Sequence, residues 1–158
     1  MRTAQEYNMG MLDAILARKI RLIDYERMTN DRGERIVKFG RFAGVAGMMD
    51  VLNGLGNKLL GLARNYPDLG SLRGAVRALG NEIAKNGVPA PMMPFVCVFT
   101  GNGAVSKGAQ EVFNELPHRY VSMEEMQFLV ESGRADRRIA YGVVAEPRDY
   151  MKNTKYPR

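Results

Sequence analysis

Apolar residues recur every three or four positions in three stretches of this chain, and each stretch predicts a helix. The stretches are residues 4–19, 42–62 and 71–87. The third is the most sharply bounded, because Ser71 is a good N-cap and an Asn-Gly pair at 86–87 is a typical helix end. Its predicted buried stripe consists of Leu72, Val76, Leu79 and Ile83.

Glycines interrupt the second helical stretch at five positions. They are Gly44, Gly47, Gly54, Gly56 and Gly61. Each glycine costs a helix about 1 kcal/mol relative to alanine. A helix of this composition needs another element packed closely against it, which the missing side chains permit. We therefore predict a closely packed connecting helix over residues 42–62.

Two shorter runs between the first two helices are rich in branched residues, which is typical of strands. They are residues 20–25 and 34–39. Residues 29–33 (TNDRG) lie between them and have the composition of a turn. The sequence thus predicts a strand, a turn and a second strand.

Beyond residue 94 the pattern changes to short apolar runs that alternate with helical segments. Residues 88–94 hold three prolines and predict an irregular hinge. Residues 95–100 form a continuous apolar run, as in a parallel strand buried on both faces. A helix follows, then a strand near residues 120–121, a helix capped by Ser122 with Glu125 in a capping box, and a strand over 139–144. The helix after the first strand is predicted to bury Val105, Ala109, Val112, Phe113 and Leu116.

This β-α-β-α-β order predicts an α/β fold with a parallel sheet, since strands joined through helices run parallel. We interpret residues 95–145 as the first half of a Rossmann-like dinucleotide-binding domain. Residues 65–94 are a helix and a proline-rich hinge, and the polar residues 146–158 are expected to form a loose tail.

Composition narrows the classes of function. With 46% hydrophobic and 25% charged residues among 158, the chain has the composition of a globular protein. The net charge of +6 is spread along the chain without an aromatic stripe, so nucleic acid is not the expected partner. No apolar run is long enough for a membrane span. The chain has one cysteine and one histidine, which excludes an internal disulfide and a zinc cluster, so no metal site is expected. Because proteins of reducing compartments rarely contain disulfides, we predict an intracellular location, cytoplasmic or mitochondrial.

The turn after residues 95–100 carries the candidate chemistry. Gly101 permits a tight turn out of the strand, and Gly103 lets backbone amides approach a pyrophosphate at the N-terminus of the next helix. Ser106 stands where the usual fingerprint has its third glycine. The sequence context of strand, turn, helix and strand supports the interpretation. The predicted cofactor-binding residues are Gly101, Asn102, Gly103, Ala104, Val105 and Ser106.

The end of the second predicted strand bears on the choice of cofactor. An acidic residue there would bind the ribose hydroxyls of NAD, but this chain has Ser122, and Arg119 could meet a 2′-phosphate. NADP is therefore predicted, with NAD as the alternative.

Four segments of the chain resemble, in order, segments of the lysine-ketoglutarate reductase half of the α-aminoadipic semialdehyde synthase family. They are residues 8–13 (NMGMLD), 21–26 (RLIDYE), 39–48 (FGRFAGVAGM) and 105–117 (VSKGAQEVFNELP). The resemblance implies an oxidoreductase that condenses lysine and 2-oxoglutarate to saccharopine with NADPH. It also implies that residues 1–64 are the end of an alanine dehydrogenase-like substrate domain plus a linking helix.

Further site residues follow from the resemblance alone. Glu26 would lie near the substrate and support catalysis by tuning the pKa of a basic neighbour, while Arg41 and Phe42 would bind substrate at an inter-domain cleft. The family's acid–base histidine and lysine have no counterpart before Ala4, where this chain reads Met-Arg-Thr. The isolated chain is therefore expected to be an inactive fragment that pairs with another copy or with the remaining parts of the enzyme. The alternative is a non-catalytic fragment that binds a nucleotide or a protein.

Overall fold

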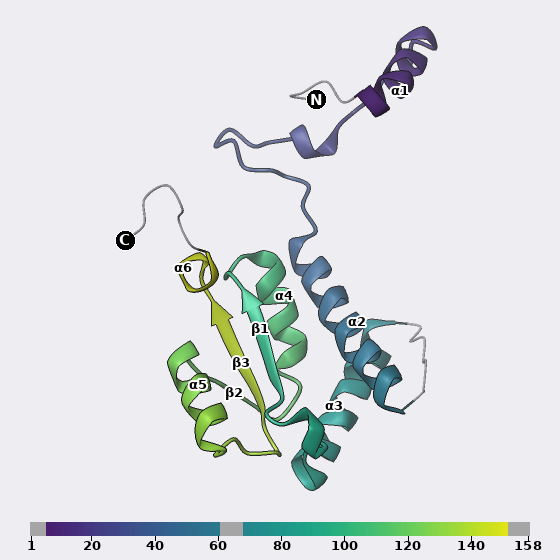
Figure 1. The fold of residues 1–158 in the computed structure, drawn as a ribbon. Helices are drawn as coiled ribbons and strands as arrows, with labels where there is room; N and C mark the ends of the chain where they lie inside the picture. The colour runs from purple at the N-terminus through teal and green to yellow at the C-terminus, as the bar shows by residue number, and fades with distance from the viewer. Residues whose placement is uncertain (1–5, 61–67, 152–158) are drawn as a thin grey trace. The chain divides into compact units, whose positions relative to one another are not determined.

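A computed structural model describes residues 6–60 and 68–151 of the chain (Figure 1). They fall into two compact units, an N-terminal unit from Met1 to Lys38 and a C-terminal unit from Phe39 to Arg158. None of the helices in these described ranges is long and apolar enough to span a membrane.

The N-terminal unit contains α1 (Glu6–Ala17) and a 3-10 turn, η1 (Tyr25–Arg27). The helix predicted over 4–19 is confirmed over residues 6–17, whereas residues 18 and 19 form a turn. The two predicted strands are wrong, because only an isolated antiparallel bridge joins Thr29 to Arg35. A two-stranded ribbon needs a further element packed on it, and no described residue of this unit is buried.

The turn between those runs is confirmed in detail. Asn30 accepts hydrogen bonds at Oδ1 from the backbone N–H groups of Arg32 (3.0 Å) and Glu34 (2.9 Å). Gly33 adopts φ +76°, a left-handed conformation that favours glycine. Local side chain–backbone hydrogen bonds therefore hold this turn without a surrounding sheet.

Two helices open the C-terminal unit: α2 (Gly40–Leu60) and α3 (Leu69–Asn86). The predicted connecting helix is confirmed, while Gly61 lies outside the described residues. The predicted cap of α3 is wrong by three residues. Asp68 is the N-cap, because its carboxylate reaches the Ser71 N–H (2.8 Å) and also accepts from the Ser71 hydroxyl (2.9 Å). The predicted end at Gly87 is confirmed, with φ +72°.

A parallel sheet of three strands follows. The strands are β1 (Val96–Thr100), β2 (His118–Tyr120) and β3 (Ala140–Ala145), and they are separated along the chain by α4 (Ala104–Phe113) and α5 (Met123–Ser132). This confirms the predicted α/β alternation and the parallel sheet. The order across the sheet is β1-β3-β2, so the last strand of the chain lies between the other two.

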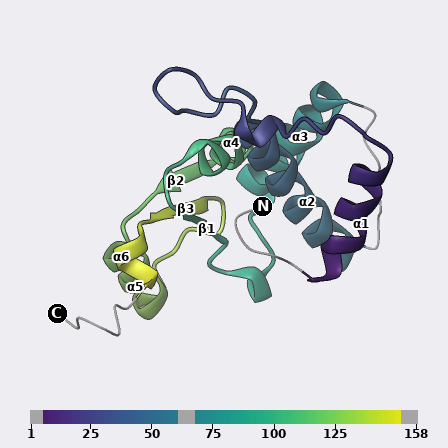
Figure 2. The same ribbon diagram turned by 90° about the horizontal axis from the view of Figure 1, so that it is seen from above.

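Helices cover both faces of the sheet (Figure 2). On one face α2, α3 and α4 share a core with β1 and β3, and on the other α5 packs over Tyr141 and Val143 of β3. Buried in the first core are Val45, Met48, Met49, Leu52, Val76, Ile83, Val88, Phe99, Val112, Phe113, Leu116 and Ala140. Cys97 is half-buried on that face, and burial raises its pKa to about 11.

Strand β1 departs from one expectation. It was predicted to be buried on both faces, but Val98 is 54% exposed. In the described part of the chain β1 pairs only with β3, and α5 packs on β3, so the α5 side of β1 stays open.

The predicted hinge and tail contain short helical turns. Residues 88–94 include a 3-10 turn, η2 (Ala90–Met92), and Val88 is buried with its N–H donating to Arg137 O at 2.7 Å. The predicted tail begins with α6 (Pro147–Tyr150), and residues 152–158 lie outside the described part. The domain boundaries predicted at 64, 94 and 145 stay predictions.

Candidate functional site

The turn after β1 has the geometry that the sequence predicts for a phosphate-binding turn. Gly101 adopts φ +78° and its N–H donates to Ala145 O at 2.7 Å, so the chain leaves β1 while still attached to β3. Gly103 is the N-cap of α4 and no side chain caps the helix. The first N–H groups of α4 therefore have no intrahelical partner and can donate to an anion.

Two helices begin at this place. A Cβ at Gly40, the first residue of α2, would lie 3.0 Å from Cβ of Ala104, the first residue of α4. The N-terminus of a helix carries a partial positive charge. Two such termini side by side next to exposed residues 102–105 favour a bound anion more than one terminus does.

The third-glycine position of the fingerprint has a different role here. Ser106 accepts a hydrogen bond from Gln110 Nε2 at 2.9 Å, within α4. The close approach occurs two residues later, at Gly108, where a Cβ would lie only 2.0 Å from Arg41 O. Glycine in α4 thus permits the close contact between α4 and α2.

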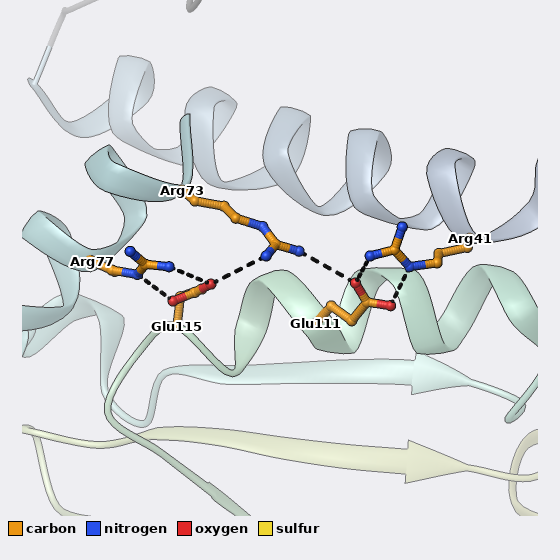
Figure 3. A network of polar contacts seen from close by, with 5 residues as sticks. All are labelled: Arg41, Arg73, Arg77, Glu111 and Glu115. Carbon is orange, nitrogen blue, oxygen red and sulfur yellow. Dashed lines mark hydrogen bonds and ion pairs between the residues drawn. The ribbon is translucent and has the colours of Figure 1, made fainter. Parts of the chain in front are cut away.

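A ladder of ion pairs joins α2, α3 and α4 (Figure 3). Arg41 donates through Nε and Nη2 to both carboxylate oxygens of Glu111, at 2.7 and 2.6 Å. Arg77 binds Glu115 in the same two-point manner, at 2.7 and 3.3 Å. Arg73 lies between them, 3.4 Å from Glu111 and 3.9 Å from Glu115. Two-point pairs of this kind fix orientation as well as charge, so the ladder holds the three helices in register.

The ladder predicts a pH dependence of stability. The hydrogen bond from Arg41 lowers the pKa of Glu111 below its ordinary value of 4.5, and Arg77 does the same for Glu115. Both carboxylates therefore stabilise the fold fully above about pH 4.5, and this contribution is lost as pH falls through the lowered pKa values.

Urea unfolding of the wild type and of a Glu111→Gln/Glu115→Gln variant, from about pH 3 to about pH 7, checks this expectation. The wild type should be the more stable at the upper end, and the difference should vanish at the lower end. A difference that is independent of pH would show that these charges do not stabilise the fold.

The residues that the resemblance assigned to the substrate lie in both units. Glu26 is in η1 of the N-terminal unit, where its Oε1 accepts from Arg35 Nη2 at 3.1 Å. Arg41 and Phe42 are in the first turn of α2, with the Arg41 guanidinium 5.5 Å from the Phe42 ring centroid. Glu111 already occupies one edge of the Arg41 guanidinium. The substrate roles of these residues stay predictions.

The end of β2 provides less for a cofactor than its sequence suggested. Ser122 is the N-cap of α5 and accepts from the Glu125 N–H at 3.1 Å, so half of the predicted capping box is confirmed. The Glu125 carboxylate pairs with Arg119 instead of closing the box. Arg119, predicted to meet a 2′-phosphate, therefore has an acidic partner within the protein.

Sequence reasoning missed Arg73, Arg77, Glu111 and Glu115. The sequence did contain a signal for them, which is equal spacing. The two arginines lie four residues apart, as do the two glutamates, so each pair is expected on one face of a helix or of the residues directly after it. Nothing in the sequence, however, shows which charged pairs face each other.

Taken together, the parallel sheet, the glycine turn at the carboxyl end of β1 and the helix that begins there define an α/β protein with a candidate phosphate-binding turn. No family model matches the chain. It is 48% identical, over 152 aligned residues, to the mitochondrial alpha-aminoadipic semialdehyde synthases of Bos taurus and Mus musculus, covering 89% of this chain. The alpha-aminoadipic semialdehyde synthase of Arabidopsis thaliana is 36% identical over an alignment of 170 positions that covers 95% of this chain.

The chain is therefore homologous to one segment of the alpha-aminoadipic semialdehyde synthases. It spans 16% of the length of each of these relatives.

Proposed function

We propose that this chain is the nicotinamide dinucleotide-binding segment of an oxidoreductase of lysine metabolism. In the longer proteins to which it is homologous, we propose that the reaction is the reductive condensation of lysine and 2-oxoglutarate to saccharopine. The names of the relatives support the link to lysine metabolism. As part of the same proposal, residues 95–145 form a Rossmann-like domain. The protein is located inside the cell, in the cytoplasm or in mitochondria.

The observation that carries the proposal is the turn at residues 101–103. It lies at the carboxyl edge of the parallel sheet, where ligands of α/β proteins bind, and leads into the uncapped N-terminus of α4. The amides of Ala104, Val105 and Ser106 would donate to the pyrophosphate. The dinucleotide supplies the hydride, and the protein's part is to hold it in a fixed orientation.

A substitution at Gly103 tests the proposal. Its backbone is extended (φ −80°, ψ −176°) and no atom lies within 4 Å of a Cβ placed there, so Gly103→Ala should fold normally. The added methyl group would stand where the pyrophosphate must approach the amides. We expect saturable binding of NADH or NADPH to the wild type, and at least about a tenfold weaker affinity in the variant.

Gly54→Ala is the matched control, because Gly54 also has open space around its Cβ position but lies within α2. It should leave nucleotide affinity unchanged. Absence of saturable binding by the wild type would overturn the proposed function, and equal affinity in the Gly103→Ala variant would exclude this turn as the site.

We also propose that the 158-residue chain alone does not catalyse the reaction. Its one histidine, His118, starts β2, with Nδ1 2.8 Å from Leu116 O. Within the N-terminal unit, the described partner of Glu26 is Arg35, in an ion pair.

A second candidate function, protein binding, has an observation of its own. The described residues of the N-terminal unit include no buried side chain, and ten of its large apolar side chains are exposed. They are Tyr7, Met9, Met11, Leu16, Ile20, Leu22, Ile23, Tyr25, Met28 and Ile36. Another copy of the chain or the remaining parts of a longer enzyme would cover them. Sedimentation of the chain at several concentrations distinguishes binding of another copy from binding of the remaining parts of a longer enzyme. A chain that stays monomeric at all concentrations would exclude self-association.

A further inference from the structure

We propose that the outer edge of β1 is a pairing surface, and that two copies of this chain associate through it. In the dimer, β1 of one copy lies antiparallel to β1 of the other, so that the two sheets become one continuous sheet. The inference goes beyond the proposed function, because it involves neither the glycine turn nor a nucleotide. It also concerns a different surface from the exposed apolar side chains of the N-terminal unit.

The backbone of β1 is paired on one side only among the residues that the structure describes. Its neighbour there is β3, and β1 forms one edge of the sheet (Figure 1). Phe95 O accepts from the Tyr141 N–H at 2.8 Å, and the Gly101 N–H donates to Ala145 O at 2.7 Å. Every second residue from Phe95 to Gly101 therefore faces β3, and the residues between them direct their N–H and C=O groups outward. These outward residues are Val96, Val98 and Thr100.

Strand β1 lacks the features by which edge strands avoid pairing. Its sequence, Val96–Thr100 (VCVFT), contains no charged residue, no proline and no glycine. Its register with β3 is continuous over all of its residues, so no bulge distorts it. Natural edge strands are usually short, or carry charges, prolines or bulges that prevent pairing with another chain. A regular, uncharged edge strand is instead a template for a further strand.

The opposite edge of the sheet has those protective features. Strand β2 is only three residues long, it follows Pro117, and Arg119 stands at its centre. It therefore offers few backbone groups to a neighbouring chain, and a strand placed beside it would meet a charged side chain. The contrast between the two edges singles out β1 as the edge that pairs.

The side chains of β1 support the same conclusion. Val96 packs against the core under α5, and Val98 lies on the same face because residues two apart in a strand share a face. Val98 is nevertheless 54% exposed, whereas the adjacent Phe99, on the other face, is 6% exposed. A strand placed beside β1 would cover Val98, and a valine opposite it would add an apolar cross-strand contact.

A second copy of β1 fits this edge. With a two-fold axis at Val98, the N–H and C=O of this residue bond to those of Val98 of the second copy. Val96 then bonds to Thr100 of the second copy in the same way, so every outward N–H and C=O of both strands is paired. The two Val98 side chains lie next to each other, and β1 contributes no charge that opposes the pairing. Because the same patch serves both copies, the dimer is closed, and a β2 strand lies at each outer edge of the combined sheet.

Sedimentation equilibrium of the full chain, from about 1 to about 100 μM protein, tests the proposal. The salt concentration is about 0.15 M, where charges more than about 8 Å apart are largely screened. We expect a reversible equilibrium between monomer and dimer for the wild type. Val98→Lys places two like charges opposite each other at the two-fold axis, so it should weaken dimerisation at least about tenfold. Because Val98 is exposed in the monomer, this variant should fold normally.

Val130→Lys is the matched control, because Val130 is 53% exposed on α5 and the substitution adds the same charge. Its dimerisation should stay within about a factor of two of the wild type. Amide hydrogen exchange locates the interface. The outward N–H groups of β1 should exchange more slowly at high than at low protein concentration in the wild type and in Val130→Lys, but not in Val98→Lys.

A wild type that remains monomeric throughout this range would overturn the proposal. Equally tight dimerisation of Val98→Lys and the wild type, or a dimer in which the exchange of the outward β1 amides is not slowed, would also overturn it, since self-association would then belong to another surface. No nucleotide is present in this experiment, so its outcome is independent of the proposed function.

Discussion

Replacing Gly44 by alanine is expected to destabilise the C-terminal unit by about 3 kcal/mol or more. A Cβ at this position of α2 would lie 1.8 Å from Val105 O and 2.8 Å from Ala109 N, both backbone atoms of α4. Backbone cannot yield as the end of a side chain can, so the two helices would have to move apart. The core between them, including Val45 and Val112, would then lose contacts. Urea unfolding of the full chain measures the effect.

A second alanine substitution in the same helix gives the control. At Gly47 no atom lies within 4 Å of the position that a Cβ would take, so Gly47→Ala should stabilise α2 by up to about 1 kcal/mol, the difference in helix propensity. The two variants differ only in what the new methyl group meets. Equal stability of the Gly44→Ala variant and the wild type would show that α2 and α4 do not approach as closely as described.

Helix α2 also shows which expectations the sequence could support. Five glycines in an otherwise apolar helical stretch require a close neighbour, and at Gly44 this neighbour is present. The strand–turn–helix unit around Gly101, the end of α3 at Gly87 and the cap of α5 at Ser122 were predictable for a similar reason. In each case a few adjacent residues determine the local backbone through conformational preference or capping.

The features that could not be predicted depend on pairing between distant segments. Periodicity identifies β3 as a strand but does not show that it inserts between β1 and β2. The ion pair between Arg41 and Glu111 joins residues 70 positions apart. Residues 20–25 have strand composition, but they pair with no strand among the residues that the structure describes, so composition alone gave the wrong element.

Replacing Phe113 by alanine is expected to destabilise the C-terminal unit by about 3–5 kcal/mol. Phe113 ends α4, is fully buried, and lies with its ring centroid 5.4 Å from that of Phe99 and 5.6 Å from that of Tyr120. A Cβ at Gly142 of β3 would come within 2.8 Å of the Phe113 ring, so the strand backbone rests on this side chain. Truncation would leave a cavity between α4 and the sheet that the surrounding backbone cannot fill.

Phe128→Ala is the control for Phe113→Ala, because Phe128 lies on α5 with 54% of its surface exposed. The centroid of its ring lies 6.0 Å from the guanidinium carbon of Arg134, and losing this cation–π interaction should lower the free energy of unfolding by at most about 1 kcal/mol. Chemical unfolding of both variants, with the slope of the transition compared to the wild type, separates a change in stability from a change in compactness. Similar losses in the two variants would contradict the placement of Phe113 at the centre of the core, because the same ring is removed from both.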